Sequence, residues 1–139
     1  MTKEETKIEI VIDAQGGILG RIASYAAKQA LLGKKVVIVN CEQALIAGRK
    51  QNIVEEYQKI RRRGGSSLKG PFFPKDPERV MKRTVRGMLS YTQQRGLDAF
   101  KRVMCYNQVP KEYEANKKIT FVRDLKTKTI SLAELEKVI

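Results

Sequence analysis

Apolar residues in the first forty positions follow two different spacings, and these predict a strand, a helix and a second strand. Residues 7–12 (KIEIVI) form a short run rich in β-branched residues, and it ends in the turn sequence of residues 13–17. From residue 18 to residue 32 the apolar side chains recur at helical spacing, and Gly33 is a natural stop after the helix. Residues 35–39 (KVVIV) resemble a strand that is buried on both faces of a parallel sheet. This order predicts a βαβ unit and hence an α/β fold.

The middle of the chain predicts two further helices. Residues 41–48 suggest one turn of helix and a third short strand, and residues 51–60 form a helical pattern with one apolar face. Asp76, Pro77 and Glu78 match an N-cap, a first-turn proline and a first-turn acid. We expect the helix that begins there to run to about Leu89 or Tyr91.

Shorter elements follow towards the end of the chain. Residues 103–106 are strand-like, and residues 119–122 predict one more extended piece. Ser131 and Glu134 form a capping box before a final short helix. A length of 139 residues suits one domain spanning residues 1–139, with a core at 1–48, a middle region at 49–111 and a C-terminal segment at 112–139.

The helix that begins near Pro77 has two contrasting faces. Its apolar residues form one stripe, which consists of Val80, Met81, Val85, Met88 and Leu89. Its cations lie one above another on a second face, at Arg79, Lys82, Arg83 and Arg86. Stacked like charges repel by a few tenths of a kcal/mol per pair. The arrangement is favourable if a row of phosphates lies along that face.

Positive charge is concentrated in the same part of the chain. The protein has 28 Lys and Arg against 15 Asp and Glu, a formal charge of +13. Residues 49–111 hold sixteen of the basic residues and five of the acidic ones, so nearly all of the excess lies there. A block of one sign attracts polyanions, of which nucleic acid is the most common. We call residues 49–111 the basic segment.

Missing residue types exclude several kinds of chemistry. The chain has no His, which excludes imidazole metal sites and His-based acid–base catalysis. Cys41 and Cys105 lack the spacing of a zinc ribbon or a redox pair, and we expect both to be small buried hydrophobes. The acidic residues show no clustered metal-ligand pattern.

No apolar run approaches the ~18 residues of a membrane span, and the start of the chain lacks the apolar stretch of a signal peptide. We therefore expect a soluble intracellular protein without a metal or cofactor.

The glycines after the first strand invite a comparison with dinucleotide-binding folds. The fingerprint needs glycine where Gln15 stands, although Gly17 and Gly20 match its later positions. Asn40 stands where an acid would hold the ribose. We expect instead that Gly16 and Gly17 form the turn and that Gly20 lets the helix pack closely on the sheet.

Two loop features adjoin the basic residues. Arg61, Arg62 and Arg63 precede a Gly-Gly-Ser-Ser stretch, and guanidinium groups in such a setting favour phosphate contacts. Phe72 and Phe73, between two prolines, are suited either to stacking on unpaired bases or to packing against the core. Packing is the favoured interpretation.

Seven short features occur in order along the chain: GILGRIAS (17–24), VVIVN (36–40), GPFFP (70–74), RTVRGML (83–89), Arg95-Gly96, AFKR (99–102) and Tyr106. Together they closely resemble one family, the thirteenth protein of the large ribosomal subunit in its archaeal and eukaryotic branch. The resemblance covers about residues 8–113. It implies a three-layer α/β/α fold on a small parallel sheet of about four strands. It also implies a structural role without catalysis, beside other ribosomal proteins.

The resemblance implies RNA contacts at four segments, namely Arg49-Lys50, Lys69–Lys75, Arg79–Arg86 and Arg95–Arg102. These coincide with the basic stretches found from charge and helical spacing. The expected rRNA-binding residues are Arg49, Lys50, Arg61, Arg62, Arg63, Lys69, Lys75, Arg79, Lys82, Arg83, Arg86, Arg95, Lys101 and Arg102, with Phe72 and Phe73 as base-stacking candidates. The expected partners are large-subunit rRNA and neighbouring ribosomal proteins, in the cytoplasm, with no membrane and no small-molecule substrate.

Two other functions stay open from the residues alone. One is a nucleotide-dependent enzyme on the βαβ unit, which saturable binding of a dinucleotide would reveal. The other is a free-standing RNA-binding regulator, which would not sediment with large subunits in high salt.

Overall fold

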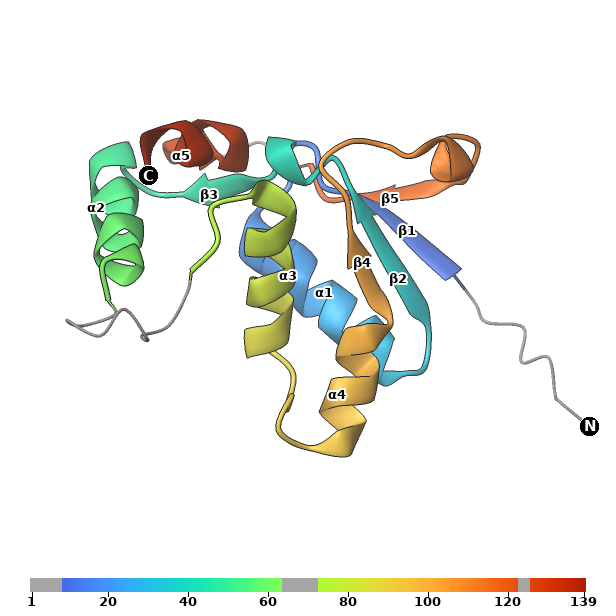
Figure 1. The fold of residues 1–139 in the computed structure, drawn as a ribbon. Helices are drawn as coiled ribbons and strands as arrows, with labels where there is room; N and C mark the ends of the chain where they lie inside the picture. Colours follow the sequence, from blue (N-terminus) through green and yellow to red (C-terminus); the bar gives the residue numbers. More distant parts are fainter. Residues whose placement is uncertain (1–8, 64–72, 123–125) are drawn as a thin grey trace, which may run out of the picture.

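A four-stranded parallel sheet lies at the centre of the fold (Figure 1). The computed structural model describes residues 9–63, 73–122 and 126–139. The strand order is β4-β2-β1-β5, and every neighbouring pair is parallel. The strands are β1 (Glu9–Asp13), β2 (Lys35–Val39), β4 (Val103–Cys105) and β5 (Lys118–Thr120). The predicted parallel sheet is therefore confirmed, and β2 is buried along Val36–Val39 as expected.

The two faces of the sheet are covered differently. Ile12 and Ile38 point to one face, where they pack in the main core with three helices: α1 (Leu19–Leu31), α3 (Pro77–Gly87) and α4 (Gln94–Lys101). Val11 and Val37 point to the other face and pack against Tyr113. Tyr113 belongs to a short 3-10 helix, η2 (Lys111–Tyr113). The fold is thus α/β with three layers, and the third layer is thin.

A smaller unit lies beside the sheet (Figure 1). It contains the 3-10 helix η1 (Cys41–Gln43), the strands β3 (Leu45–Ala47) and β6 (Thr129–Ser131), and the helices α2 (Lys50–Arg61) and α5 (Leu132–Val138). Strands β3 and β6 pair antiparallel. The sequence predicted β3 and both helices but missed β6, because three residues are too few for a periodic pattern. The Ser131 cap is confirmed, since its hydroxyl accepts a hydrogen bond from the Glu134 N–H at 3.3 Å.

Helix α1 ends at Gly33, as the sequence predicts. Gly33 has φ +91°, a left-handed conformation that glycine adopts without strain. Its N–H donates to the Ala30 carbonyl at 3.0 Å, and the Lys34 N–H donates to the Gln29 carbonyl at 3.2 Å. This Schellman pattern satisfies carbonyls that the helix leaves unpaired and returns the chain to β2.

The glycine turn before α1 corrects one expectation. Gly16, with φ +71°, forms the turn. The close approach occurs at Gly17, where an added Cβ would lie 2.8 Å from the Ile22 side chain and 3.1 Å from that of Phe121. A Cβ at Gly20 would meet no atom within 4 Å, so the expectation that Gly20 allows close packing is wrong.

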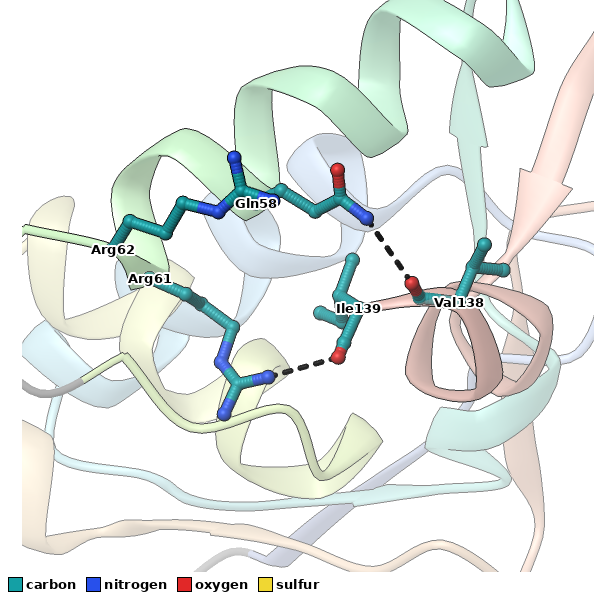
Figure 2. A pocket seen from close by; sticks show the side chains of 5 residues that line it. All are labelled: Gln58, Arg61, Arg62, Val138 and Ile139. Carbon is teal, nitrogen blue, oxygen red and sulfur yellow. Dashed lines mark hydrogen bonds between the residues drawn. The ribbon is translucent and has the colours of Figure 1, made fainter.

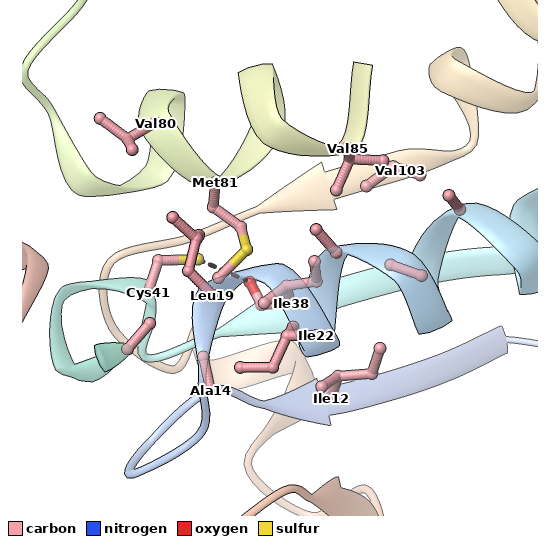
Figure 3. Packing of buried hydrophobic residues seen from close by; sticks show 14 of the residues in the cluster. Ile12, Ala14, Leu19, Ile22, Ile38, Cys41, Val80, Met81, Val85 and Val103 are labelled. Atoms are coloured by element: carbon pink, nitrogen blue, oxygen red, sulfur yellow. Dashed lines mark hydrogen bonds between the residues drawn. The ribbon is translucent and has the colours of Figure 1, made fainter. Parts of the chain in front are cut away.

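The main core joins α3 to α1 and the sheet (Figure 3). Met81 lies between the two layers near Leu19 and Ile38, and it is fully buried. Cys41 is fully buried and its thiol donates to the Ile38 carbonyl at 3.7 Å, whereas Cys105 is half-buried. The neighbouring Cys105 thiol and burial both raise the pKa of Cys41. Cys41 is therefore a neutral packing residue, as expected, and Cys105 is only partly so.

Helix α3 is shorter than the sequence predicts. It ends at Gly87, and the chain then forms a turn that includes Met88 and Tyr91. Leu89 is buried as predicted, but Met88 is 44% exposed. The assignment of Met88 to the apolar stripe is wrong, because the helical spacing does not continue past Gly87.

The start of α3 is capped by a residue from another part of the chain. Asp76 occupies the N-cap position, but its side chain makes no capping hydrogen bond. Instead, the Oδ1 atom of Asn107 accepts a hydrogen bond from the Glu78 N–H at 2.9 Å. Asn107 follows β4, so this bond ties the end of the sheet to the start of α3.

We expect Asn107→Ala to lower the free energy of unfolding by about 1 kcal/mol, the usual cost of a lost N-cap. Asp76→Ala is the matched control, and it should cost only a few tenths of a kcal/mol because it removes a charge near the helix start and no hydrogen bond. Urea denaturation of both variants measures the difference. Equal losses in the two variants would contradict a specific capping role for Asn107.

Candidate nucleic-acid interface

Helix α3 turns one face into the core and carries cations on the other. Val80, Met81 and Val85 are at most 2% exposed. We call the four cations of the opposite side the basic row: Arg79, Lys82, Arg83 and Arg86. The predicted amphipathic helix with a charged face is confirmed.

Three members of the basic row lie against aromatic rings. The Lys82 Nζ atom lies 5.1 Å from the centre of the Phe100 ring, and the Arg83 Cζ atom lies 5.0 Å from that of Phe73. The Arg86 Cζ atom lies 4.2 Å from the centre of the Tyr91 ring. Contacts of this kind attract a cation electrostatically and restrict its side chain. A guanidinium that stacks on a ring keeps its N–H groups in its own plane, where they suit a phosphate.

Most of the other predicted cations are exposed. Eight have exposed side chains: Arg49, Lys50, Arg62, Arg63, Lys75, Arg79, Arg95 and Lys101. They lie at both ends of α2, before and on α3, and on α4. Lys69 and Phe72 lie outside the described residues. The exposed cations thus extend the basic row onto the neighbouring helices.

Arg61 bonds within the protein (Figure 2). Its Nε–H donates to the Phe73 carbonyl at 3.3 Å, and its Nη1–H donates to the Ile139 carbonyl at 2.9 Å. Beside it, the Gln58 amide donates to the Val138 carbonyl at 3.3 Å. Arg61 therefore joins the end of α2, the segment before α3 and the end of α5. The structure gives this residue a positioning role that its place in an Arg-Arg-Arg run does not reveal.

Arg102 has a similar internal contact. Its Nη1–H donates to the Ala30 carbonyl at 3.0 Å, close to the end of α1. A cation near the end of a helix also interacts favourably with the helix dipole. The contact ties the end of α4 to α1.

Phe73 packs within the protein. It is half-buried against the main core, and its ring meets that of Tyr57 edge to face, with centroids 5.3 Å apart. Its other contact is Arg83, which lies over the ring. The structure places Phe73 in packing and as a support for the basic row, which agrees with the favoured interpretation.

The charge of the basic segment is not neutralised by acids. Among the described residues, an ion pair joins the Lys35 Nζ atom to the Glu9 Oε1 atom at 3.5 Å, and both residues lie outside the segment. Leaving Arg83 aside, no Lys or Arg of the segment forms an ion pair in the part of the chain that the structure describes. Glu55 and Asp98 accept hydrogen bonds from Gln51 and Gln94 instead. The exposed cations in the described part of the segment are therefore available to an external anion.

Apart from Phe73, the residues that contact α3 from other parts of the chain were missed by sequence reasoning. Phe100 and Tyr91 follow the helix by several residues, and Asn107 lies in a loop after β4. Their only sequence signal is that they are aromatic or amide residues near the basic stretches. Spacing along the chain does not show that they contact α3, because the turn between α3 and α4 decides it.

No group of three Asp, Glu or Cys residues gathers into a metal site within residues 9–63, 73–122 and 126–139. Over the same ranges, no helix has the length and apolar character to cross a bilayer.

Comparison with known families shows which family the chain belongs to. The family model described as "Ribosomal protein L13" matches residues 7–112, which include α1–α4 and the whole basic segment. The chain belongs to this family. The resemblance inferred from the sequence strings is thereby confirmed. The family is one of ribosomal proteins and not of enzymes, so the expectation of a non-enzymatic protein is confirmed as well.

Archaeal relatives in the L13 family match over most of the chain, and each is called "Large ribosomal subunit protein uL13". The protein of Methanosarcina barkeri is 49% identical over 111 residues, 79% of each chain. That of Methanocaldococcus jannaschii is 44% identical over 130 residues, which cover 91% of this chain and 94% of the relative. The protein of Natronomonas pharaonis is 42% identical over 136 residues, with 97% and 93% covered. The last two alignments extend into the C-terminal segment.

Proposed function

We propose that this L13-family protein is a structural component of the large ribosomal subunit and binds large-subunit rRNA through its basic segment. The observation that carries the proposal is the set of exposed cations on α2, α3 and α4 that have no acidic partners among the described residues. The names of the archaeal relatives support the assignment to the large subunit. The protein would act in translation, in the cytoplasm, beside other ribosomal proteins and without a cofactor.

The mechanism is electrostatic and geometric. Lys and Arg side chains neutralise phosphates and release the counterions that these hold, which favours binding strongly at low salt. Phosphate contacts set position and orientation but carry little information about base sequence. The rigid contacts of α3 with α1 fix the basic row on one line, and the aromatic rings hold its side chains in place. The single domain would therefore present a preformed surface that supports subunit assembly.

The predicted site residues divide into three groups under this proposal. The exposed cations and the basic row contact phosphate. Lys69 is expected to do the same. Arg61 and Arg102 position the helices through carbonyl bonds. Phe73 supports Arg83 rather than stacking on a base.

Binding to rRNA across a salt series tests the function. We expect tight binding to one large-subunit rRNA fragment, a steep loss of affinity with salt, and survival of the complex against competing transfer RNA. Arg79→Ala should lower the salt slope by about one, since one phosphate contact is lost. Lys137 is an exposed cation on α5, outside the basic segment, so Lys137→Ala should leave the salt slope unchanged. Weak and equal binding to every RNA would contradict the proposal.

A further inference from the structure

A recess on the far side of the sheet from α1 and α3 shares Lys101 and Arg102 with the surface described above, but its other lining residues have not been assigned a role. It has a volume of about 740 Å³ and lies over β2 and β4. Its lining includes Lys35, Lys101, Arg102, Met104, Tyr106 and Tyr113. We call it the far-face recess. It exists because the third layer of the fold is thin and leaves part of this face uncovered.

The floor and wall of the far-face recess are apolar and aromatic. Met104 lies on β4, an edge strand of the sheet, and is 37% exposed. Tyr106 and Tyr113 pack together with ring centroids 6.1 Å apart, tilted by 36°. Tyr113 is buried, whereas Tyr106 is half-buried and lines the recess. The recess therefore offers a thioether and an aromatic ring to a flat ligand.

The rim of the far-face recess is mainly positive. Lys35 lies at one side and forms the ion pair with Glu9; burial alone would lower its pKa, but the Glu9 carboxylate and the Tyr113 hydroxyl together raise it. Lys101 is exposed at the end of α4, and Glu112 is the acid of the lining. Lys101 also belongs to the basic segment. The recess is thus continuous with the proposed RNA-binding surface around the edge of β4.

We propose that the far-face recess binds one unpaired nucleotide of the bound RNA, with its base against Met104 and Tyr106 and its phosphate near Lys101. The inference rests on the proposed function, and it adds a site for a base where the basic row provides contacts for phosphates. Proteins that recognise single-stranded RNA combine cations that follow the backbone with aromatic side chains on which bases stack. A volume of about 740 Å³ lies in the range of roughly 300–1,000 Å³ that small-ligand sites occupy.

The binding test uses Tyr106→Leu and Met104→Glu with the cognate rRNA fragment. Tyr106→Leu keeps an apolar side chain but removes the ring, and we expect about tenfold weaker binding with an unchanged salt slope, because no charge is lost. Met104→Glu places a carboxylate in the recess at an exposed position and should also weaken binding. Wild-type affinity in both variants would overturn the proposal and leave the proposed function intact. Circular dichroism confirms that both variants are folded.

A second measurement does not depend on rRNA binding. Nucleoside monophosphates are titrated into the full chain, and methyl signals of methionine are followed by NMR. Met104 should shift, and buried Met81 serves as the reference that should not. If the protein fails to prefer any rRNA fragment but Met104 still shifts, the proposed function fails and the nucleotide site stands.

Photochemical crosslinking in assembled large subunits identifies the occupant directly. A nucleotide adduct on the peptide that contains Met104 and Tyr106 supports the proposal. A crosslink from this peptide to another protein chain, with no nucleotide adduct, would overturn it.

Discussion

Reversing three charges of the basic row, with Arg79→Glu, Lys82→Glu and Arg86→Glu combined, is expected to lower the affinity for large-subunit rRNA at least roughly a hundredfold near physiological salt. Each lost phosphate contact lowers the slope of log affinity against log salt by about one. If the variant and the wild type bind equally at ~1 M salt, where these contacts are screened, the loss of three contacts makes the affinity of the variant about two orders of magnitude lower at about 0.15 M salt. The carboxylates add repulsion to this loss. A filter-binding or fluorescence assay over a salt series measures both quantities.

The control for this variant carries the same change in net charge at other places. Arg21, Lys28 and Lys137 are exposed and lie on α1 and α5, outside the basic segment. Replacing all three with Glu should change the affinity far less, because these residues are not on the proposed surface. Equal losses in the two triple variants would contradict a local interface and indicate that only the overall charge matters.

The fold should survive the reversal on α3. The replaced side chains lie on the side of the helix opposite Val80, Met81 and Val85, which form its buried face. The lost ring contacts of Lys82 and Arg86, which are half-buried, cost about 1 kcal/mol each. The melting temperature of the variant separates this small cost from the loss of binding.

The two faces of α3 show how far sequence reasoning reaches. Helical spacing alone places Val80 and Met81 on one side and Arg79 and Lys82 on the other, because a helix repeats every 3.6 residues. The same spacing does not show where a long side chain ends. Arg61 contacts a carbonyl 78 positions away, and Arg102 contacts one 72 positions away. Such contacts depend on the tertiary arrangement and separate positioning arginines from those that remain exposed.

Short-range sequence patterns also fail where residues that are far apart in the sequence are in contact. Asp76 has the right sequence for a cap, but Asn107 makes the hydrogen bond because β4 ends beside the start of α3. Gly20 has the right spacing for a close approach, but Gly17 makes it because Phe121 comes from the far end of the chain. Strand β6 is visible only through its pairing with β3. In each case the chemistry of the residue is readable in the sequence and its partner is not.

Gly96→Ala is expected to lower the free energy of unfolding by about 3 kcal/mol, at the upper end of the usual range for overpacking. Gly96 lies on α4 and is buried against the backbone of Ser90. An added Cβ would collide with the Ser90 carbonyl, which accepts a hydrogen bond from the Gln93 N–H at 3.0 Å. Because the obstacle is backbone, the turn between α3 and α4 must move as a whole. Urea denaturation measures the loss.

Gly20→Ala is the matched control for this substitution. It also adds one methyl group to a helical glycine, but no atom lies within 4 Å of the new Cβ. It should stabilise the protein by about 0.5–1 kcal/mol, since alanine favours a helix over glycine. The two substitutions should also differ in their effect on rRNA binding. Gly96→Ala displaces the turn that contains Tyr91, whose ring contacts the Arg86 guanidinium. Gly96→Ala should therefore also weaken rRNA binding, whereas Gly20→Ala should not. A loss of stability in Gly20→Ala equal to that in Gly96→Ala would contradict the close contact with Ser90 as the cause.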